Sequence, residues 1–155
     1  MPEFVQIAAE KFGMSAQFLG TPSGLLYLVQ LIIGVIAGFI IQVIWDGGNI
    51  FVSFFLSNYP MQTYVYFAIF ITNVAVLALI LMEINQGGST ETLGKTKLLI
   101  FHVICSVLIL IAACMESYYV STGPIMSWRF WTTMFILWVL FLTHVAQVVL
   151  GFLFK

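Results

Sequence analysis

The stretch "LLYLVQLIIGVIAGFIIQVIW" (Leu25–Trp45) decides the fold, because it contains no Asp, Glu, Lys or Arg. A helix needs about 17–25 mainly apolar residues to cross a hydrocarbon core about 30 Å thick. Three more runs free of these charged residues follow, at Gln62–Met82, Leu98–Met115 and Phe130–Phe154. The sequence therefore predicts four transmembrane helices.

The composition agrees with a membrane protein. Of the 155 residues, 62% are hydrophobic and only 7% are charged, whereas about a quarter are charged in soluble domains. We expect an all-α, integral membrane four-helix bundle. Residues 1–23 are predicted to form a cytoplasmic or interfacial N-terminal segment, and residues 24–155 the four-helix domain. The formal net charge of −1 gives no reason to expect a nucleic-acid partner.

The few basic residues predict the orientation. With four spans both termini lie on one side, together with the loop between the second and third helices. That side would hold Lys11, Lys95, Lys97 and Lys155, and the opposite side only Arg129. Because basic residues favour the cytoplasmic side, we expect both termini to be cytoplasmic.

The first span has glycine or glutamine at every fourth residue, at Gln30, Gly34, Gly38 and Gln42. Residues spaced by four share one ridge of a helix, and the two glycines form a small-xxx-small notch that admits another helix backbone. We expect the two glutamines to hydrogen-bond across this notch. The partner helix could belong to the same chain, to a second copy of it or to another membrane protein, and packing within the chain is the simplest of these.

Further polar residues within the predicted spans are Asn73, His102, Glu116, His144 and Gln147. Lipid tails cannot satisfy their hydrogen-bonding groups, so these side chains should point into the bundle. Their spacing places the polar residues of each helix among small or apolar residues of the same face. A seam of small and polar residues inside a hydrophobic exterior is therefore expected.

Three of these residues raise the question of chemistry. His102 and His144 lie at similar depths on antiparallel helices, where haem or a metal could be shared, but one pair of histidines is a weak ligand pattern. Glu116 could serve proton-coupled transport, or could simply form an ion pair with Arg129 near the interface. We predict no catalytic residue, no metal site, no cofactor and no enzymatic activity.

Three segments carry a resemblance to a family: "FLGTPSGLLYLVQLIIGVIAGFI" (Phe18–Ile40), "FHVICSVLILIAACMES" (Phe101–Ser117) and "LFLTHVAQVVLGFLFK" (Leu140–Lys155). They resemble the MARVEL-domain family of MAL and plasmolipin-like tetraspan proteins. There, too, the third helix begins near a histidine and ends at a glutamate. This chain departs from the family in lacking cysteines in its outer loops.

The resemblance implies a structural membrane organiser at the plasma membrane or on vesicles. Such proteins associate with cholesterol- and sphingolipid-rich membranes (lipid rafts) and act in vesicle trafficking, cell junctions and other membrane contacts. Two alternatives remain open from the residues. One is an accessory or assembly-forming subunit of a larger membrane complex, which requires an exposed notch. The other is a small transporter or haem-binding electron carrier, which requires a continuous polar path or paired axial histidines.

Overall fold

The computed structural model describes residues 18, 20–46, 49–52, 60–85, 93–122 and 127–153. Four helices in this part of the chain are long and apolar enough to cross a membrane. They are α2 (Pro22–Gln42), α3 (Met61–Asn85), α5 (Lys95–Ser121) and α6 (Ser127–Leu153). The predicted all-α four-helix bundle is thus confirmed. Of the predicted N-terminal segment, residues 1–17 and 19 lie outside the described residues.

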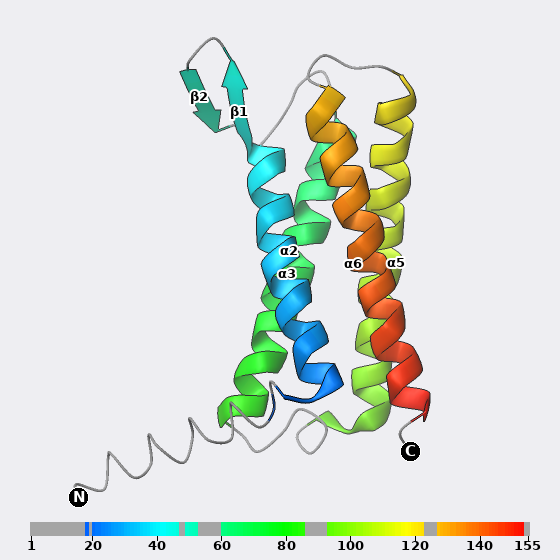
Figure 1. Cartoon of the computed structure of the whole chain (residues 1–155). Helices are drawn as coiled ribbons and strands as arrows, with labels where there is room; N and C mark the ends of the chain where they lie inside the picture. Colours follow the sequence, from blue (N-terminus) through cyan, green and yellow to red (C-terminus); the bar gives the residue numbers. More distant parts are fainter. Residues whose placement is uncertain are drawn as a thin grey trace, which may run out of the picture.

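The helices run antiparallel to their neighbours in the chain (Figure 1). α2 packs against α3 and α6, and α5 packs against the same two helices, so the four form a ring. We call the end at which α2 and α5 begin the lower end, and the opposite end the upper end, as drawn in Figure 1. The start of α2 and the end of α6 therefore lie together at the lower end, as an even number of spans requires.

Local sequence sets the start of α2. The hydroxyl of Thr21 accepts a hydrogen bond from the Gly24 amide at 3.0 Å, and Pro22 occupies the first helical position. A threonine cap followed by proline is a common way to begin a helix, because both remove otherwise unsatisfied amide groups. The helix ends at Gln42, three residues before the predicted Trp45. Its 21 residues already reach about 31 Å, enough to span the hydrocarbon core.

The residues after Gln42 form a small β-hairpin, which the sequence analysis did not predict. Strand β1 (Val43–Asp46) pairs antiparallel with β2 (Asn49–Val52), with Val43 opposite Val52. The two residues between the strands are Gly47 and Gly48. Two short β-prone runs separated by two glycines are a hairpin signal, and the predicted span had absorbed the first of them.

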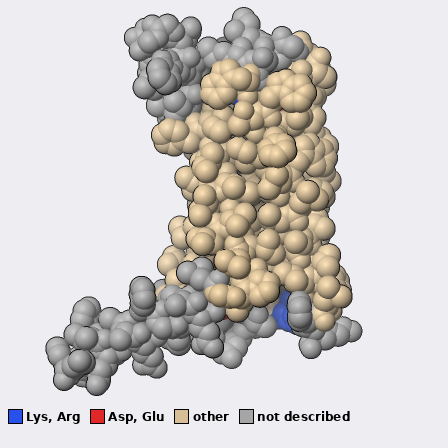
Figure 2. Space-filling view, viewed as in Figure 1, with Lys and Arg blue, Asp and Glu red and all other residues tan. Residues whose placement is uncertain are grey.

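The central part of the interior is mainly apolar, with Gln30, Thr72 and Ser106 as buried polar residues among the apolar ones. Alanines at several buried positions let the helix backbones approach closely, which is how helices associate when lipid is as apolar as the side chains. The main core cluster comprises Ala37, Ile41, Val65, Ala68, Ile69, Ile109, Ala112, Ala113, Leu137 and Leu140. Large apolar side chains such as Phe39, Phe70 and Phe135 point outward. Figure 2 shows this exterior as a band without charge, with blue basic atoms visible near its lower end.

Candidate functional site

Polar side chains gather at two levels inside the bundle. The upper polar cluster consists of Gln62 (α3), Glu116 (α5), Arg129 and Thr133 (α6), and all four are buried. Glu116 has no exposed surface, and the Gln62 amide donates a hydrogen bond to its carboxylate. With Ile41 and Phe130 these residues surround a void too small for a water molecule. The upper polar cluster is therefore closed to solvent.

Arg129 closes the upper end of α2. Its guanidinium donates to the carbonyl of Ile40 at 3.1 Å and also to the carbonyl of Ile41. The last carbonyls of a helix lack partners within the helix and carry partial negative charge, so a cation is favourable there. Arg129 thus ties α6 to α2 by hydrogen bonds that its position in the sequence does not reveal.

Glu116 and Arg129 attract each other electrostatically inside the upper polar cluster, as the sequence suggested, but without direct contact. Both residues lie in the same cluster, but within the described residues no direct salt bridge joins them. Gln62 lies against the carboxylate instead, and the guanidinium is committed to α2. Glu116 also lies away from the water that a position near the interface had suggested, because α5 turns this residue toward the bundle axis.

The lower polar cluster consists of Ser23 and Tyr27 (α2), His102 (α5), and His144 and Gln147 (α6). The Tyr27 hydroxyl and His102 Nε2 lie 2.9 Å apart, and the rings of His102 and His144 have centroids 5.8 Å apart. Ser23 donates its hydroxyl to the Gln147 amide oxygen at 2.8 Å, and the Gln147 amide nitrogen donates to the Ser23 carbonyl at 2.9 Å. The cluster therefore joins α2, α5 and α6 at one level.

Several buried polar atoms of the described residues have no hydrogen-bond partner. They are both amide atoms of Gln30, Nδ1 of His102, Nδ1 of His144 and one carboxylate oxygen of Glu116. An unsatisfied buried polar group costs roughly 1–3 kcal/mol, so such atoms are uncommon. Two of them belong to the lower polar cluster, and His102 also lines the cavity described next.

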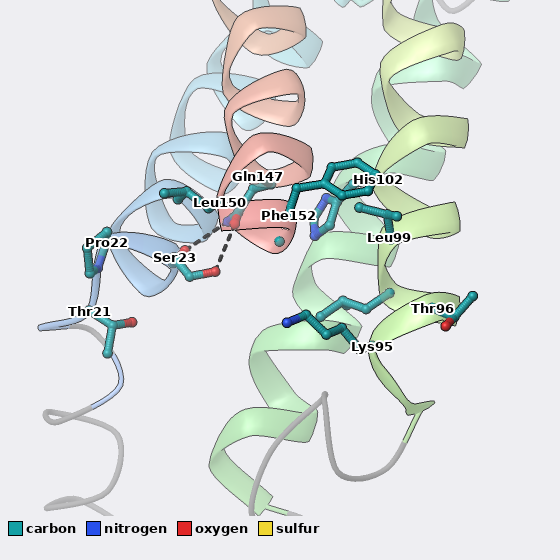
Figure 3. Close-up of a pocket in the computed structure, with 12 residues that line it drawn as sticks. Thr21, Pro22, Ser23, Lys95, Thr96, Leu99, His102, Gln147, Leu150 and Phe152 are labelled. Atoms are coloured by element: carbon teal, nitrogen blue, oxygen red, sulfur yellow. Dashed lines mark hydrogen bonds between the residues drawn. The ribbon is translucent and has the colours of Figure 1, made fainter. Parts of the chain in front are cut away.

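A cavity of about 640 Å³ lies between α2, α5 and α6 at the lower end of the bundle (Figure 3). Its walls are largely apolar, with polar groups at the deep end and at the mouth. His102 and Gln147 form the deep end, and Lys95 and Phe152 line the mouth. His102 lies seven residues after Lys95 along α5, and Gln147 lies five residues before Phe152 along α6. The complete lining is Thr21, Pro22, Ser23, Lys95, Thr96, Leu98, Leu99, His102, Gln147, Leu150, Gly151 and Phe152.

The notch in α2 faces a helix of the same chain. A Cβ added to Gly34 would overlap the amide of Asn73 from α3 and lie 2.8 Å from its Cγ. At Gly38 the nearest atom to such a Cβ would be Cγ2 of Ile69, at an ordinary 3.8 Å. Gly34 is thus a point of close approach to α3, whereas Gly38 is only half-buried against it.

The predicted glutamine contacts of this ridge are corrected. Gln30 is buried, yet its amide has no hydrogen-bond partner within the described part of the chain, and Gln42 is only half-buried. A step of four residues turns about 40° beyond a full helical circle, so the four positions drift about 120° around α2. Gln30 and Gly34 therefore face the interior. Further along α2 the buried residues are Ala37 and Ile41, each one position before the predicted Gly38 and Gln42.

The arrangement does not fit two of the chemical alternatives. Paired axial ligands need room for a haem between the two imidazoles, but the His102 and His144 rings contact each other, with centroids 5.8 Å apart, and α5 packs directly on α6. Glu116 and His102 are also separated by about 21 Å along α5, with the apolar residues Ile109, Ala112 and Ala113 between them. The described residues also contain no group of three or more histidine, cysteine or acidic side chains able to hold a metal.

Ser23, Tyr27 and Gln62 were not among the predicted site residues. Ser23 and Tyr27 precede Gln30 and Gly34 at helical spacing, so the ridge of α2 extends about two turns further down than was predicted. Gln62 stands directly at the start of a span, where glutamine is easily taken for an interfacial residue. Only the packing of α3 on α5 reveals its contact with Glu116.

Comparisons of the chain with protein-family models, curated proteins and solved structures find no match. The class of protein is therefore defined by its own fold. Four apolar helices with outward hydrophobic and inward polar side chains form a four-span, multi-pass integral membrane protein.

Proposed function

We propose that the protein is a non-enzymatic, structural organiser of lipid domains that acts in vesicle trafficking or at membrane contacts. It works through association with lipids and with other membrane proteins, at the plasma membrane or on vesicles. The resemblance to MARVEL-domain proteins suggests this role, and the arrangement of the side chains supports it. Polar groups are engaged in holding the helices together, while the surface offered to the surroundings is apolar.

The length of the uncharged helices is the observation that carries the proposal. In α3 the residues from 61 to 82, and in α6 those from 130 to 153, contain no charge and reach about 33 and 36 Å. Sterol- and sphingolipid-rich membranes have hydrocarbon cores of roughly 32–33 Å, against an average of about 30 Å. By the same measure α2 reaches about 31 Å and the uncharged part of α5 (Leu98–Met115) about 27 Å, so the match to a thicker membrane rests on α3 and α6.

The accessory-subunit alternative requires an open notch on α2. Because Asn73 of α3 occupies the surface of Gly34, this notch is not available for a partner. Docking on another protein would need a different surface. The organiser function has no such requirement, since lipid contacts involve the whole exterior.

Partitioning in phase-separated vesicles derived from plasma membranes tests the proposal. We expect the tagged protein to concentrate in the thicker, sterol-rich phase. The double variant Trp131→Lys and Phe135→Lys serves as the matched control, because both side chains are outward and the change shortens the uncharged part of α6 to about 27 Å. Exclusion of the parent from the thick phase, or identical partitioning of both proteins, would contradict the proposal.

The proposed orientation has both termini in the cytoplasm, on the side with the most basic residues. Tags fused to either end should then resist protease in intact cells and become accessible after permeabilisation. Surface labelling of a terminal tag on intact cells would reverse the orientation.

A further inference from the structure

The cavity at the lower end of the bundle has the size and walls of a site for an apolar molecule. Small-molecule pockets usually measure about 300–1,000 Å³, and this cavity has about 640 Å³. Leu98 and Leu99 of α5 and Leu150 of α6 line it between the deep end and the mouth. Water finds few polar partners along such walls, whereas an apolar molecule removes their surface from water. An occupant must therefore present a mainly apolar body to these leucines.

The mouth of the cavity offers no free charge. Lys95 is the single charged residue among the described lining residues, and it already has an interaction partner. The hydroxyl of Thr21 is also engaged, since it donates to the Phe18 carbonyl and accepts from the Gly24 amide. A charged ligand without a partner would lose its hydration at a high cost in free energy. The lining therefore favours a neutral occupant.

The deep end has polar groups with unused hydrogen-bonding capacity. His102 is 2% exposed, and its Nδ1 has no hydrogen-bond partner among the described residues. In Figure 3 the His102 ring extends from α5 toward Gln147 of α6. The Gln147 amide nitrogen uses one of its two N–H groups for the Ser23 carbonyl, so the second remains for a ligand. One polar group of an occupant can therefore meet both residues at this point.

The contact between Tyr27 and His102 determines which kind of polar group fits. A neutral imidazole carries one proton, and the nitrogen that accepts a hydrogen bond is the one without it. The Tyr27 hydroxyl lies 2.9 Å from Nε2 of His102, and with this hydroxyl as the donor the imidazole proton is on Nδ1. Both unused groups at the deep end are then N–H donors. A carbonyl oxygen fits them, because it has two lone pairs and no proton of its own.

We propose that this cavity binds a neutral, mainly apolar molecule with a carbonyl group at one end, such as a ketone, an aldehyde or a quinone on a hydrocarbon frame. The carbonyl oxygen accepts hydrogen bonds from His102 Nδ1 and Gln147 Nε2 at the deep end. The apolar body lies along Leu99 and Leu150 toward the mouth, where Phe152 borders it. This site is additional to the proposed organiser function and does not depend on it.

Thermal unfolding of the purified protein in mild detergent tests the assignment with three probes that share one steroid frame. Androstanone carries a carbonyl, androstanol carries a hydroxyl in its place, and androstane carries neither. We expect androstanone at about 100 times its Kd to raise Tm by roughly 5–10 °C and to bind about tenfold more tightly than androstane. Androstane or androstanol binding as tightly as the ketone, or no shift with any probe, would overturn the assignment.

A pair of histidine variants locates the hydrogen bond. His102→Phe removes the donor and should abolish the tenfold preference for the ketone over androstane. His144→Phe is the matched control, because its ring adjoins His102 without lining the cavity, and the preference should persist. The infrared carbonyl band of bound androstanone should lie at lower frequency in the parent than in His102→Phe. An unchanged preference and an unchanged band in His102→Phe would show that the carbonyl is bound elsewhere.

A second pair of variants tests the cavity without altering its deep end. Leu150→Trp should fill the cavity and abolish the shift in Tm, and Leu142→Trp on the outward face of α6 is its control. Unchanged binding by Leu150→Trp in a protein that still unfolds cooperatively would overturn the site. Neither result bears on the organiser function, which the partitioning experiment tests separately.

Discussion

The upper and lower polar clusters use similar side chains in opposite ways. In the upper polar cluster Gln62 is bonded to Glu116, Arg129 is bonded to α2, and the space between them admits no water. In the lower polar cluster His102 and His144 each retain an unpartnered nitrogen, and a large cavity adjoins His102. The comparison teaches that a polar residue inside a membrane bundle can hold helices together or remain available to a ligand. Glu116 of the upper polar cluster also keeps one unpartnered oxygen, so the adjoining cavity, more than the bonding or the residue type, distinguishes the lower polar cluster.

Loss of Arg129 should have the largest effect on stability. Arg129→Met removes the bonds to α2 and leaves the buried Glu116 without a nearby positive charge, which costs about 3–5 kcal/mol. We expect a clear fall in Tm, measured by thermal unfolding in detergent, and no such fall for the exposed control Lys97→Met.

A second substitution separates charge from the lost hydrogen bonds. Glu116→Gln alone should leave folding and localisation largely intact, because an amide can keep a bond with Gln62. In the Arg129→Met background it should recover part of the lost stability. A proton-coupled flux in liposomes that Glu116→Gln abolishes would show that the upper polar cluster is functional and not structural.

Two glutamines allow a matched test of bonded and unbonded amides. Gln62→Leu leaves the Glu116 carboxylate without its donor and should cost about 1–3 kcal/mol. Gln30→Leu removes an amide that has no partner among the described residues, so Tm should stay the same or rise. Equal losses in the two variants would mean that Gln30 is hydrogen-bonded in the membrane, and the contrast would fail.

The two glycines of α2, which lie between the clusters, should give the smallest effects. Gly34→Ala must displace the Asn73 amide and should cost about 1 kcal/mol, whereas Gly38→Ala meets only an ordinary contact and should leave Tm unchanged or slightly higher. Adding Asn73→Ala to Gly34→Ala should restore stability. Equal effects of the two single alanine variants would exclude close packing of α3 at Gly34.

Much of the fold was readable because charge and hydrophobic length follow directly from the residues. Four uncharged runs predicted four spans, and helical periodicity placed His102, Glu116, His144 and Gln147 inside. The predicted end of the first span at Trp45 was wrong because hydrophobicity alone does not distinguish a helix end from a strand. The two glycines before Asn49 held the missing signal.

By itself the sequence determined the membrane class and the inward position of the polar residues of α5 and α6, since both depend on properties that repeat along one segment. Only the tertiary structure decided that Arg129 would bond to α2, that Asn73 would fill the surface of Gly34 and that a cavity would open beside His102. These outcomes depend on how far each helix is shifted and rotated against its neighbours. Such shifts are fixed by packing between residues distant in the chain, and periodicity along a single helix contains no information about them.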